Sequence, residues 1–205
     1  MVLLVLKYGF VMNKHRKSMT NTVRTDKLYP IPNIEGVRLS SKGSILDIEG
    51  PLGNVCLQMD KLDPNALCSW MVKDDEWVIF PCEYKKKANA LCNTLAKLIH
   101  QKMIGVSQGH LTKMEVSGIG YRVQLEFNET LCFKLGTSHD IIYKLPGDVR
   151  GFCTSSTEFY LYGVDKARVT GVAAQLIALR KPDPYKGKGV SIQNSLIRLK
   201  PGKKR

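Results

Sequence analysis

Residues 159–181, FYLYGVDKARVTGVAAQLIALRK, have the pattern of a strand followed by a helix. Phe159–Tyr162 is a run of aromatic and aliphatic residues, which are enriched in strands. Asp165 is a good N-cap, because its carboxylate can accept a hydrogen bond from the first turn of a helix. The helix should end before Pro182, whose ring disfavours helical backbone at the preceding residue. The apolar face of this helix consists of Val169, Val172, Ala173, Leu176 and Ile177. The segment therefore predicts a helix that packs on a sheet.

The same order of elements occurs earlier in the chain. Trp77–Phe80, 82 residues before Phe159–Tyr162, also predicts a strand, and a helical pattern follows it. The apolar face of this first helix consists of Ala88, Leu91, Cys92, Leu95, Ile99 and Met103. Two similar units of strands followed by one helix account for most of the chain. We therefore predict an α+β fold of two homologous small domains, each an antiparallel or mixed sheet with one main helix packed on a face.

Shorter strand patterns precede each helix. They lie at Val37–Leu39, Ile45–Glu49, Val55–Met59, Trp70–Val72, Tyr121–Phe127 and Leu131–Leu135. Asp74 and Asp75 indicate a hairpin turn before Trp77–Phe80, and Gln108–His110 indicates the joint between the domains. The expected layout is a basic extension over 1–29, a first domain over 30–108, a second domain over 109–180 and a basic C-terminal segment over 181–205.

The positive charge is concentrated at the two ends of the chain. The net charge is +13, of which residues 1–29 carry +5 and residues 30–110 carry none. Residues 180–205 carry +8, with nine Lys or Arg residues and one acid, Asp183. Such an excess opposes compactness, so it indicates a polyanionic partner, either a nucleic acid or an anionic membrane surface.

The C-terminal segment has the residue types of an RNA contact. Pro182 and Pro184 stiffen the chain as it leaves the last helix, and Gly187 and Gly189 let its backbone approach another surface closely. Lysines can neutralise phosphates, and Tyr185 can stack on a base or ribose. A solvated basic loop would have a similar composition. The candidate RNA-binding residues are Arg180, Lys181, Tyr185, Lys186, Gly187, Lys188, Gly189, Lys200, Lys203, Lys204 and Arg205. Deleting residues 181–205 is expected to leave a folded protein.

Four segments resemble one known family. Pro182–Val190, with the sequence PDPYKGKGV, resembles the signature of the ribosomal protein L6 family of the large subunit, of bacterial and organellar type. Lys113–Arg122 is similar to the strand and Gly-x-Gly-Tyr turn that open that family's second domain. Ile104–Gly109 is similar to its interdomain joint, and Ile31–Gly53 to its first hairpin. The similarity covers roughly residues 30–200 in the family's order.

The resemblance implies two homologous α+β domains and a structural role in the large ribosomal subunit. Family members bind large-subunit rRNA near the sarcin–ricin loop and the stalk base, where they support assembly and the docking of translation factors. Neighbouring large-subunit proteins are implied as further partners. The family makes its main rRNA contact through the second domain and the C-terminal segment, which implies this role for Tyr185, Lys186, Gly187, Lys188 and Gly189.

The first 27 residues depart from most bacterial members of the family. The stretch from Asn13 to Lys27 is rich in Lys, Arg, Ser, Thr and Asn, a composition that suits either an import segment or a basic arm that orders on RNA. We therefore expect a mitochondrial ribosome, in the matrix, with a plastid or a bacterial cytoplasm as alternatives.

An enzyme is the chief rival class, and the motifs argue against it. Gly118 and Gly120 follow a strand, but no third glycine comes at the spacing of a dinucleotide fingerprint. The four histidines are scattered, at positions 15, 100, 110 and 139. Lys85–Lys87 could touch RNA or form a solvated turn. The sequence therefore predicts no catalytic residue, no metal, no cofactor and no small-molecule substrate.

The cysteines and the apolar runs exclude further classes. The six cysteines contain no Cys-x-x-Cys pair, so zinc lacks its usual paired ligands; they are Cys56, Cys68, Cys82, Cys92, Cys132 and Cys153. Small reduced core residues in a reducing compartment are the simpler interpretation. Val2–Leu6 is far shorter than the roughly 20 residues that span a membrane, so no insertion is expected. A peripheral protein on an anionic membrane remains the alternative, although the C-terminal segment lacks an apolar helical stripe.

Overall fold

The computed structural model describes residues 28–73, 76–82, 85–127 and 129–202. The chain divides into two compact units, with the boundary between Gln108 and Gly109. The basic extension up to Lys27 and the expected turn residues Asp74 and Asp75 lie outside the described residues.

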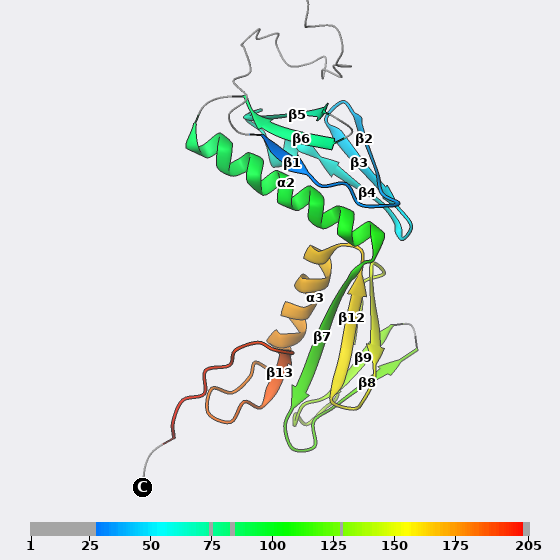
Figure 1. The fold of residues 1–205 in the computed structure, drawn as a ribbon. Coiled ribbons are helices and arrows are strands. Elements are labelled where there is room, and N and C mark those ends of the chain that lie inside the picture. Colours follow the sequence, from blue (N-terminus) through cyan, green and yellow to red (C-terminus); the bar gives the residue numbers. More distant parts are fainter. Residues whose placement is uncertain (1–27, 74–75, 83–84, 128, 203–205) are drawn as a thin grey trace, which may run out of the picture. The chain divides into compact units, whose positions relative to one another are not determined.

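The first unit contains two three-stranded antiparallel sheets and one long helix (Figure 1). Its elements are β1 (Tyr29–Ile31), β2 (Arg38–Lys42), β3 (Ile45–Gly50), β4 (Gly53–Gln58), α1 (Met59–Leu62), β5 (Cys68–Lys73), β6 (Glu76–Pro81) and α2 (Lys86–Ser107). The sheet orders are β1-β6-β5 and β2-β3-β4. Helix α2 packs against both sheets, chiefly against β6, β1 and β3. Its buried face follows the predicted spacing, with Ala88, Cys92, Leu95, Ile99 and Met103 almost inaccessible to solvent.

The second unit repeats this arrangement and adds one strand. Its elements are β7 (His110–Ser117), β8 (Arg122–Glu126), β9 (Thr130–Lys134), β10 (Ile141–Lys144), β11 (Val149–Cys153), β12 (Glu158–Gly163), α3 (Lys166–Leu179) and β13 (Gly189–Ile192). The sheet orders are β11-β12-β7-β13 and β10-β9-β8, and all pairs are antiparallel. Helix α3 packs on β7, β12 and β13, on one face of the larger sheet.

The strand orders show the internal duplication. The order β1-β6-β5 corresponds to β7-β12-β11, and β2-β3-β4 corresponds to β8-β9-β10. In each unit the main helix follows the strand that lies second in that order, β6 or β12. Among the described elements, β13 has no counterpart in the first unit. The predicted α+β class with one main helix on a sheet is confirmed.

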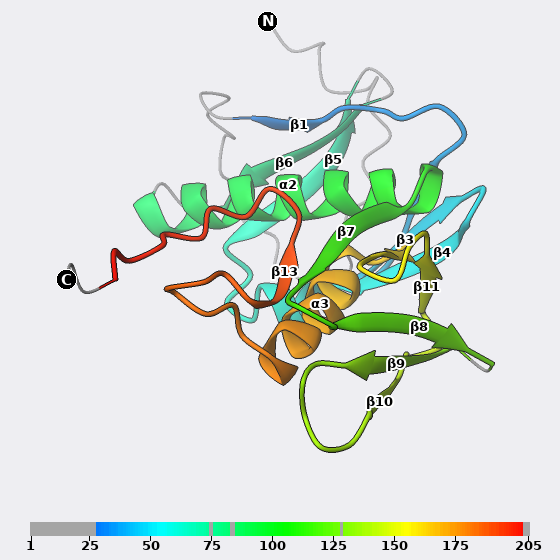
Figure 2. The same cartoon turned by 90° about the horizontal axis from the view of Figure 1, so that it is seen from below.

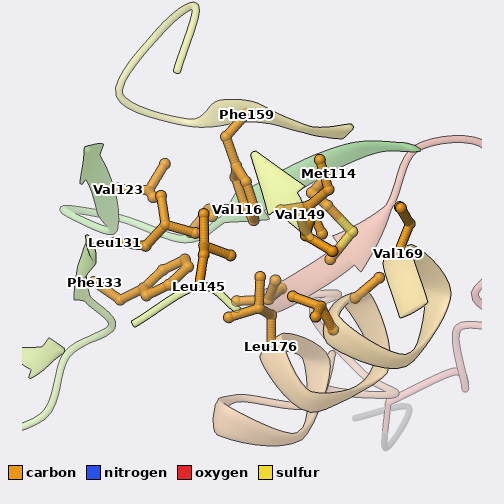
Figure 3. Close-up of a cluster of buried hydrophobic side chains, with 14 of the residues drawn as sticks. Met114, Val116, Val123, Leu131, Phe133, Leu145, Val149, Phe159, Val169 and Leu176 are labelled. Carbon is orange, nitrogen blue, oxygen red and sulfur yellow. The ribbon is translucent and has the colours of Figure 1, made fainter. Parts of the chain in front are cut away.

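The core of the second unit lies between α3 and its two sheets (Figure 3). Phe133 and Phe159 meet edge to face, with their ring centroids 5.6 Å apart, a favoured geometry for aromatic pairs. Val169, Val172, Ala173 and Leu176 form the buried face of α3, as the spacing predicts. The Asp165 carboxylate accepts a hydrogen bond from the Ala167 N–H at 2.9 Å, so the predicted N-cap is confirmed.

Two strand predictions need correction at their ends. The strand predicted over Val55–Met59 ends at Gln58, because Met59 is buried at the start of the short helix α1. The strand predicted over Tyr121–Phe127 is shorter, and Phe127 lies beyond β8 with 93% of its surface exposed. The alternation of residue types continues past the point where the hairpin leaves the core. Periodicity therefore overestimates the length of this strand.

Candidate RNA interface

The C-terminal segment forms a closed loop between α3 and β13. The Asp183 N–H donates to the Lys188 carbonyl oxygen at 2.9 Å, and the Gly187 N–H donates to the Asp183 carbonyl oxygen at 2.8 Å. Outside the loop, the Val190 N–H donates to the Arg180 carbonyl oxygen at 2.9 Å. We call residues 183–188 the basic loop. Its backbone is closed by internal hydrogen bonds, so less conformational entropy remains to be lost on binding.

The side chain of Asp183 also organises the basic loop. Its carboxylate accepts hydrogen bonds from the backbone N–H groups of Tyr185, at 3.3 Å, and Lys186, at 3.0 Å. An aspartate that bonds to backbone groups two and three residues ahead favours a turn. The one acid in residues 180–205 therefore shapes the loop that presents the lysines. From the sequence alone, Asp183 was visible only as one negative charge among the cations.

The basic loop is attached to the sheet of the second unit through β13 (Figure 2). β13 pairs with β7, and Val190 lies opposite Val116 with no exposed surface. The Ser117 hydroxyl donates to the Gly187 carbonyl oxygen, which joins the end of β7 to the loop. The chain then returns, because the Lys200 N–H donates to the Pro184 carbonyl oxygen at 2.8 Å. The position of the loop is thus set by the core of its own unit.

Gly187 and Gly189 have different roles from one another. Both have a positive φ, +69° and +151°, which L side chains rarely adopt. A Cβ at Gly187 would have only Leu199 nearby, at 3.7 Å, whereas a Cβ at Gly189 would lie 2.7 Å from Pro182 Cα and 2.8 Å from the Arg180 carbonyl oxygen. Gly189 was expected to let the backbone approach another molecule closely. The expectation is corrected, because Gly189 instead lets the chain pass close to its own backbone at Arg180 and Pro182.

Replacing Gly189 with Ala should destabilise the second unit by roughly 2 kcal/mol, because the added Cβ would collide with backbone rather than with a movable side chain. Urea unfolding of the full chain measures this change. Gly147→Ala is the matched control, since nothing lies within 4 Å of a Cβ at that position and its φ is not in the positive range. Equal stability of the two variants would show that the close approach at Gly189 relaxes without cost.

The predicted cations line a groove beside the basic loop and also lie on the loop itself. Arg180, Lys181 and Lys188 line a groove of about 510 Å³. The other residues that line this groove are Tyr121, Leu179, Pro182, Asp183 and Pro184. Lys186 and Tyr185 lie exposed on the basic loop, with 57% of Tyr185 accessible.

The remaining candidates extend this cationic surface. Lys200 is exposed and is held beside the loop through its backbone bond to Pro184. In the part of the chain that the structure describes, none of the predicted cations forms an ion pair with an acid. Their charge is therefore available to a polyanion. Lys203, Lys204 and Arg205 lie outside the described residues.

Tyr121 is a residue of this groove that sequence reasoning did not assign to the site. Its ring fills the space where Gly118 and Gly136 lack side chains, since Cβ atoms there would lie 2.5 Å and 2.9 Å from it. The Gly-x-Gly-Tyr turn thus places an aromatic ring beside Arg180 and Lys181. In the sequence, Tyr121 was visible only as part of this turn. Its position opposite the C-terminal segment depends on pairing over a long sequence distance.

The described residues contain no group of three or more His, Cys, Asp or Glu side chains that could hold a metal ion. Within the same residues, no helix has both the length and the apolar character needed to cross a membrane.

Comparison with known proteins gives concordant matches. The family model described as ribosomal protein L6 matches residues 117–192, which contain the Gly-x-Gly-Tyr turn and the basic loop. The large ribosomal subunit protein uL6 of Cupriavidus necator is 34% identical over 176 residues, which cover 86% of this chain and 96% of the relative. The protein of the same name from Cupriavidus taiwanensis matches to the same extent. The large ribosomal subunit protein uL6m of Prototheca wickerhamii is 36% identical over 191 residues, which cover 88% of this chain and 96% of the relative.

Proposed function

Because the chain belongs to the ribosomal protein L6 family, we propose that its basic loop and C-terminal tail hold it on large-subunit rRNA near the sarcin–ricin loop and the stalk base. The protein is a structural constituent of the large ribosomal subunit. Members of this family are structural proteins and not enzymes, which decides against the enzymatic alternative. Ribosomal RNA and other ribosomal proteins are its partners.

The basic loop is the observation that best supports this placement. It presents Lys186 and Lys188 on a backbone that Asp183 and β13 already hold in one conformation. Lysine ammonium groups neutralise phosphates without reading sequence, so affinity would come mainly from charge. Specificity would come from the folded shape of the RNA, with Tyr185 available to stack on an unpaired base. In this position the protein would support assembly and the docking of translation factors.

The first domain contributes less to this contact. Residues 30–110 carry no net charge, whereas residues 180–205 carry +8. Counterion release, which supplies most of the sequence-independent affinity for RNA, requires cations at the phosphates. We therefore assign the main rRNA contact to the second domain and the C-terminal segment, and assign contacts with neighbouring large-subunit proteins to the first domain.

We further propose that the ribosome in question is mitochondrial. Two observations favour this compartment: the net charge of +5 over residues 1–29, and the match to a mitochondrial relative, uL6m. The bacterial relatives match the chain about equally well, so a plastid or a bacterial cytoplasm is the alternative.

Co-sedimentation tests the function and the compartment together. Tagged full-length protein, expressed in its own cells, should migrate with large ribosomal subunits when lysed, fractionated mitochondria are resolved on a sucrose gradient. Removing Mg²⁺ to unfold the subunits should move it, together with the large-subunit rRNA, to lighter fractions. Recovery with cytoplasmic or plastid subunits would contradict the mitochondrial assignment but would still support the ribosomal function. Tighter binding to anionic lipid vesicles than to large-subunit rRNA would overturn the function itself.

A further inference from the structure

Two cysteines of the first unit lie closer together than separate thiols pack. Cys68 is the first residue of β5 and Cys92 lies on the buried face of α2, 24 residues later. Their exposed fractions are 1% and 0%, and their sulfur atoms are 2.7 Å apart. This separation exceeds the roughly 2.05 Å length of a disulfide bond by only about 0.7 Å. The fold thus places both sulfurs almost at bonding distance, although neither cysteine is in a disulfide.

The surroundings of Cys68 fix this geometry from two sides. The buried carboxylate of Asp63 accepts hydrogen bonds from the backbone N–H groups of Leu67, at 3.0 Å, and Cys68, at 2.8 Å. The Cys68 sulfur also lies 3.7 Å from the carbonyl oxygen of Ala88, on the first turn of α2. Asp63 therefore fixes the backbone at the start of β5, and the Cys68 sulfur contacts the first turn of α2.

The electrostatic environment favours one of the two thiols as the nucleophile. The hydrogen bond with Cys68 lowers the pKa of the Cys92 thiol, because it stabilises the thiolate form of Cys92. Burial and the nearby charges of Cys82 and Asp63 oppose this effect without cancelling it. Thiolates and not thiols attack disulfides, so Cys92 is suited to begin an exchange.

We propose that Cys68 and Cys92 form a redox site, at which the chain takes up one intramolecular disulfide from a low-molecular-weight disulfide. The Cys92 thiolate attacks one sulfur of the small disulfide and expels the other as a thiolate. The Cys68 sulfur then loses its proton, attacks the Cys92 sulfur and expels the second small thiolate. The two cysteines are oxidised by two electrons, and the small disulfide is reduced to two thiols.

The bond would fasten an edge strand to the main helix. β5 is an outer strand of the sheet β1-β6-β5, and α2 packs on that sheet. Since both thiols are buried, the first exchange requires a local opening that exposes the Cys92 sulfur. Once closed, the bond would restrict the unfolded chain over residues 68–92 and so favour the folded first domain. All residues of the redox site belong to the first unit, whereas the basic loop belongs to the second.

Thiol titration and disulfide mapping of the full-length protein test this proposal. The reduced protein should titrate six thiols after denaturation, matching the six cysteines of the sequence. After treatment with oxidised glutathione at neutral pH, two should be lost without bound glutathione, and peptide mapping should recover a Cys68–Cys92 link. The thermal midpoint of the oxidised protein should rise by several degrees, and reduction should reverse the shift.

Variants separate this site from nonspecific oxidation. Cys92→Ala should abolish both the linked peptide and the thermal shift, while Cys56→Ala, at an exposed position, should leave both unchanged. Should Cys92→Ala fold poorly, the linked peptide in the parent protein still decides the question. Glutathione attached to Cys56 or Cys82, with no Cys68–Cys92 link, would overturn the proposal.

Discussion

The double variant Lys186→Ala/Lys188→Ala should bind large-subunit rRNA about 50-fold more weakly at 0.1 M monovalent salt. Each phosphate that a lysine neutralises releases counterions, and the logarithm of affinity then falls with the logarithm of salt by about 0.9 per contact. Losing two contacts makes this slope shallower by roughly 1.8. Over the tenfold change in salt from 1 M to 0.1 M, this amounts to a loss of about 1.8 powers of ten in affinity. Filter binding over a salt series measures both quantities.

On a plot of log affinity against log salt concentration, the lines of the parent protein and the double variant should converge near 1 M salt. This convergence distinguishes lost phosphate contacts from other causes of weaker binding. Lys186→Arg/Lys188→Arg keeps both charges and should keep the parent slope. Lys42→Ala/Lys73→Ala removes the same charge from exposed positions of the neutral first domain and should change neither slope nor affinity. A loss of affinity that is constant at all salt concentrations would instead indicate a distorted loop, and an unchanged slope would remove the basic loop from the RNA contact.

Local chemistry made the two main helices predictable. The face of α3, its N-cap at Asp165 and its end before Pro182 each depend on residues within one or two turns of one another. The face of α2 follows the same three- and four-residue spacing. Because a helix with one apolar face needs a partner surface, these two patterns were enough to predict the α+β class and its duplication.

Structure that depends on distant pairing was not predictable in this way. β13 has four residues, too few for a periodic pattern, and it exists because Val190 pairs with Val116, a residue more than 70 positions earlier. The proximity of Cys68 to Cys92 likewise arises from the packing of β5 on α2 and from no local motif. The role of Asp183 in the basic loop was likewise not predictable from the sequence. Its type and position were visible, but its role required the direction of the backbone N–H groups of the loop.

The strand β13 changes what a truncation of the C-terminal segment would test. On the sequence alone, deletion of residues 181–205 was expected to leave a folded protein. In the structure this deletion also removes Val190, which is fully buried, and the pairing of β13 with β7. Losing one buried Val costs about 1.5–3 kcal/mol, and each lost ladder hydrogen bond costs about 1 kcal/mol. The expected loss of roughly 3–5 kcal/mol is a large part of the stability of a small domain.

Two truncations therefore separate anchoring from folding. A chain that ends at Gln193 keeps β13 and the hydrogen bond from the Gln193 N–H to the Lys113 carbonyl oxygen, and it should unfold at nearly the parent urea concentration. It loses five of the nine cations of residues 180–205, so it should bind rRNA with a shallower salt dependence and enter large subunits poorly. A chain that ends at Arg180 should fail on both measures. If it instead unfolds at the parent urea concentration, β13 contributes nothing to the stability of the fold. If the chain ending at Gln193 enters subunits normally, the anchor is the basic loop and not the tail, because only the loop remains in that variant.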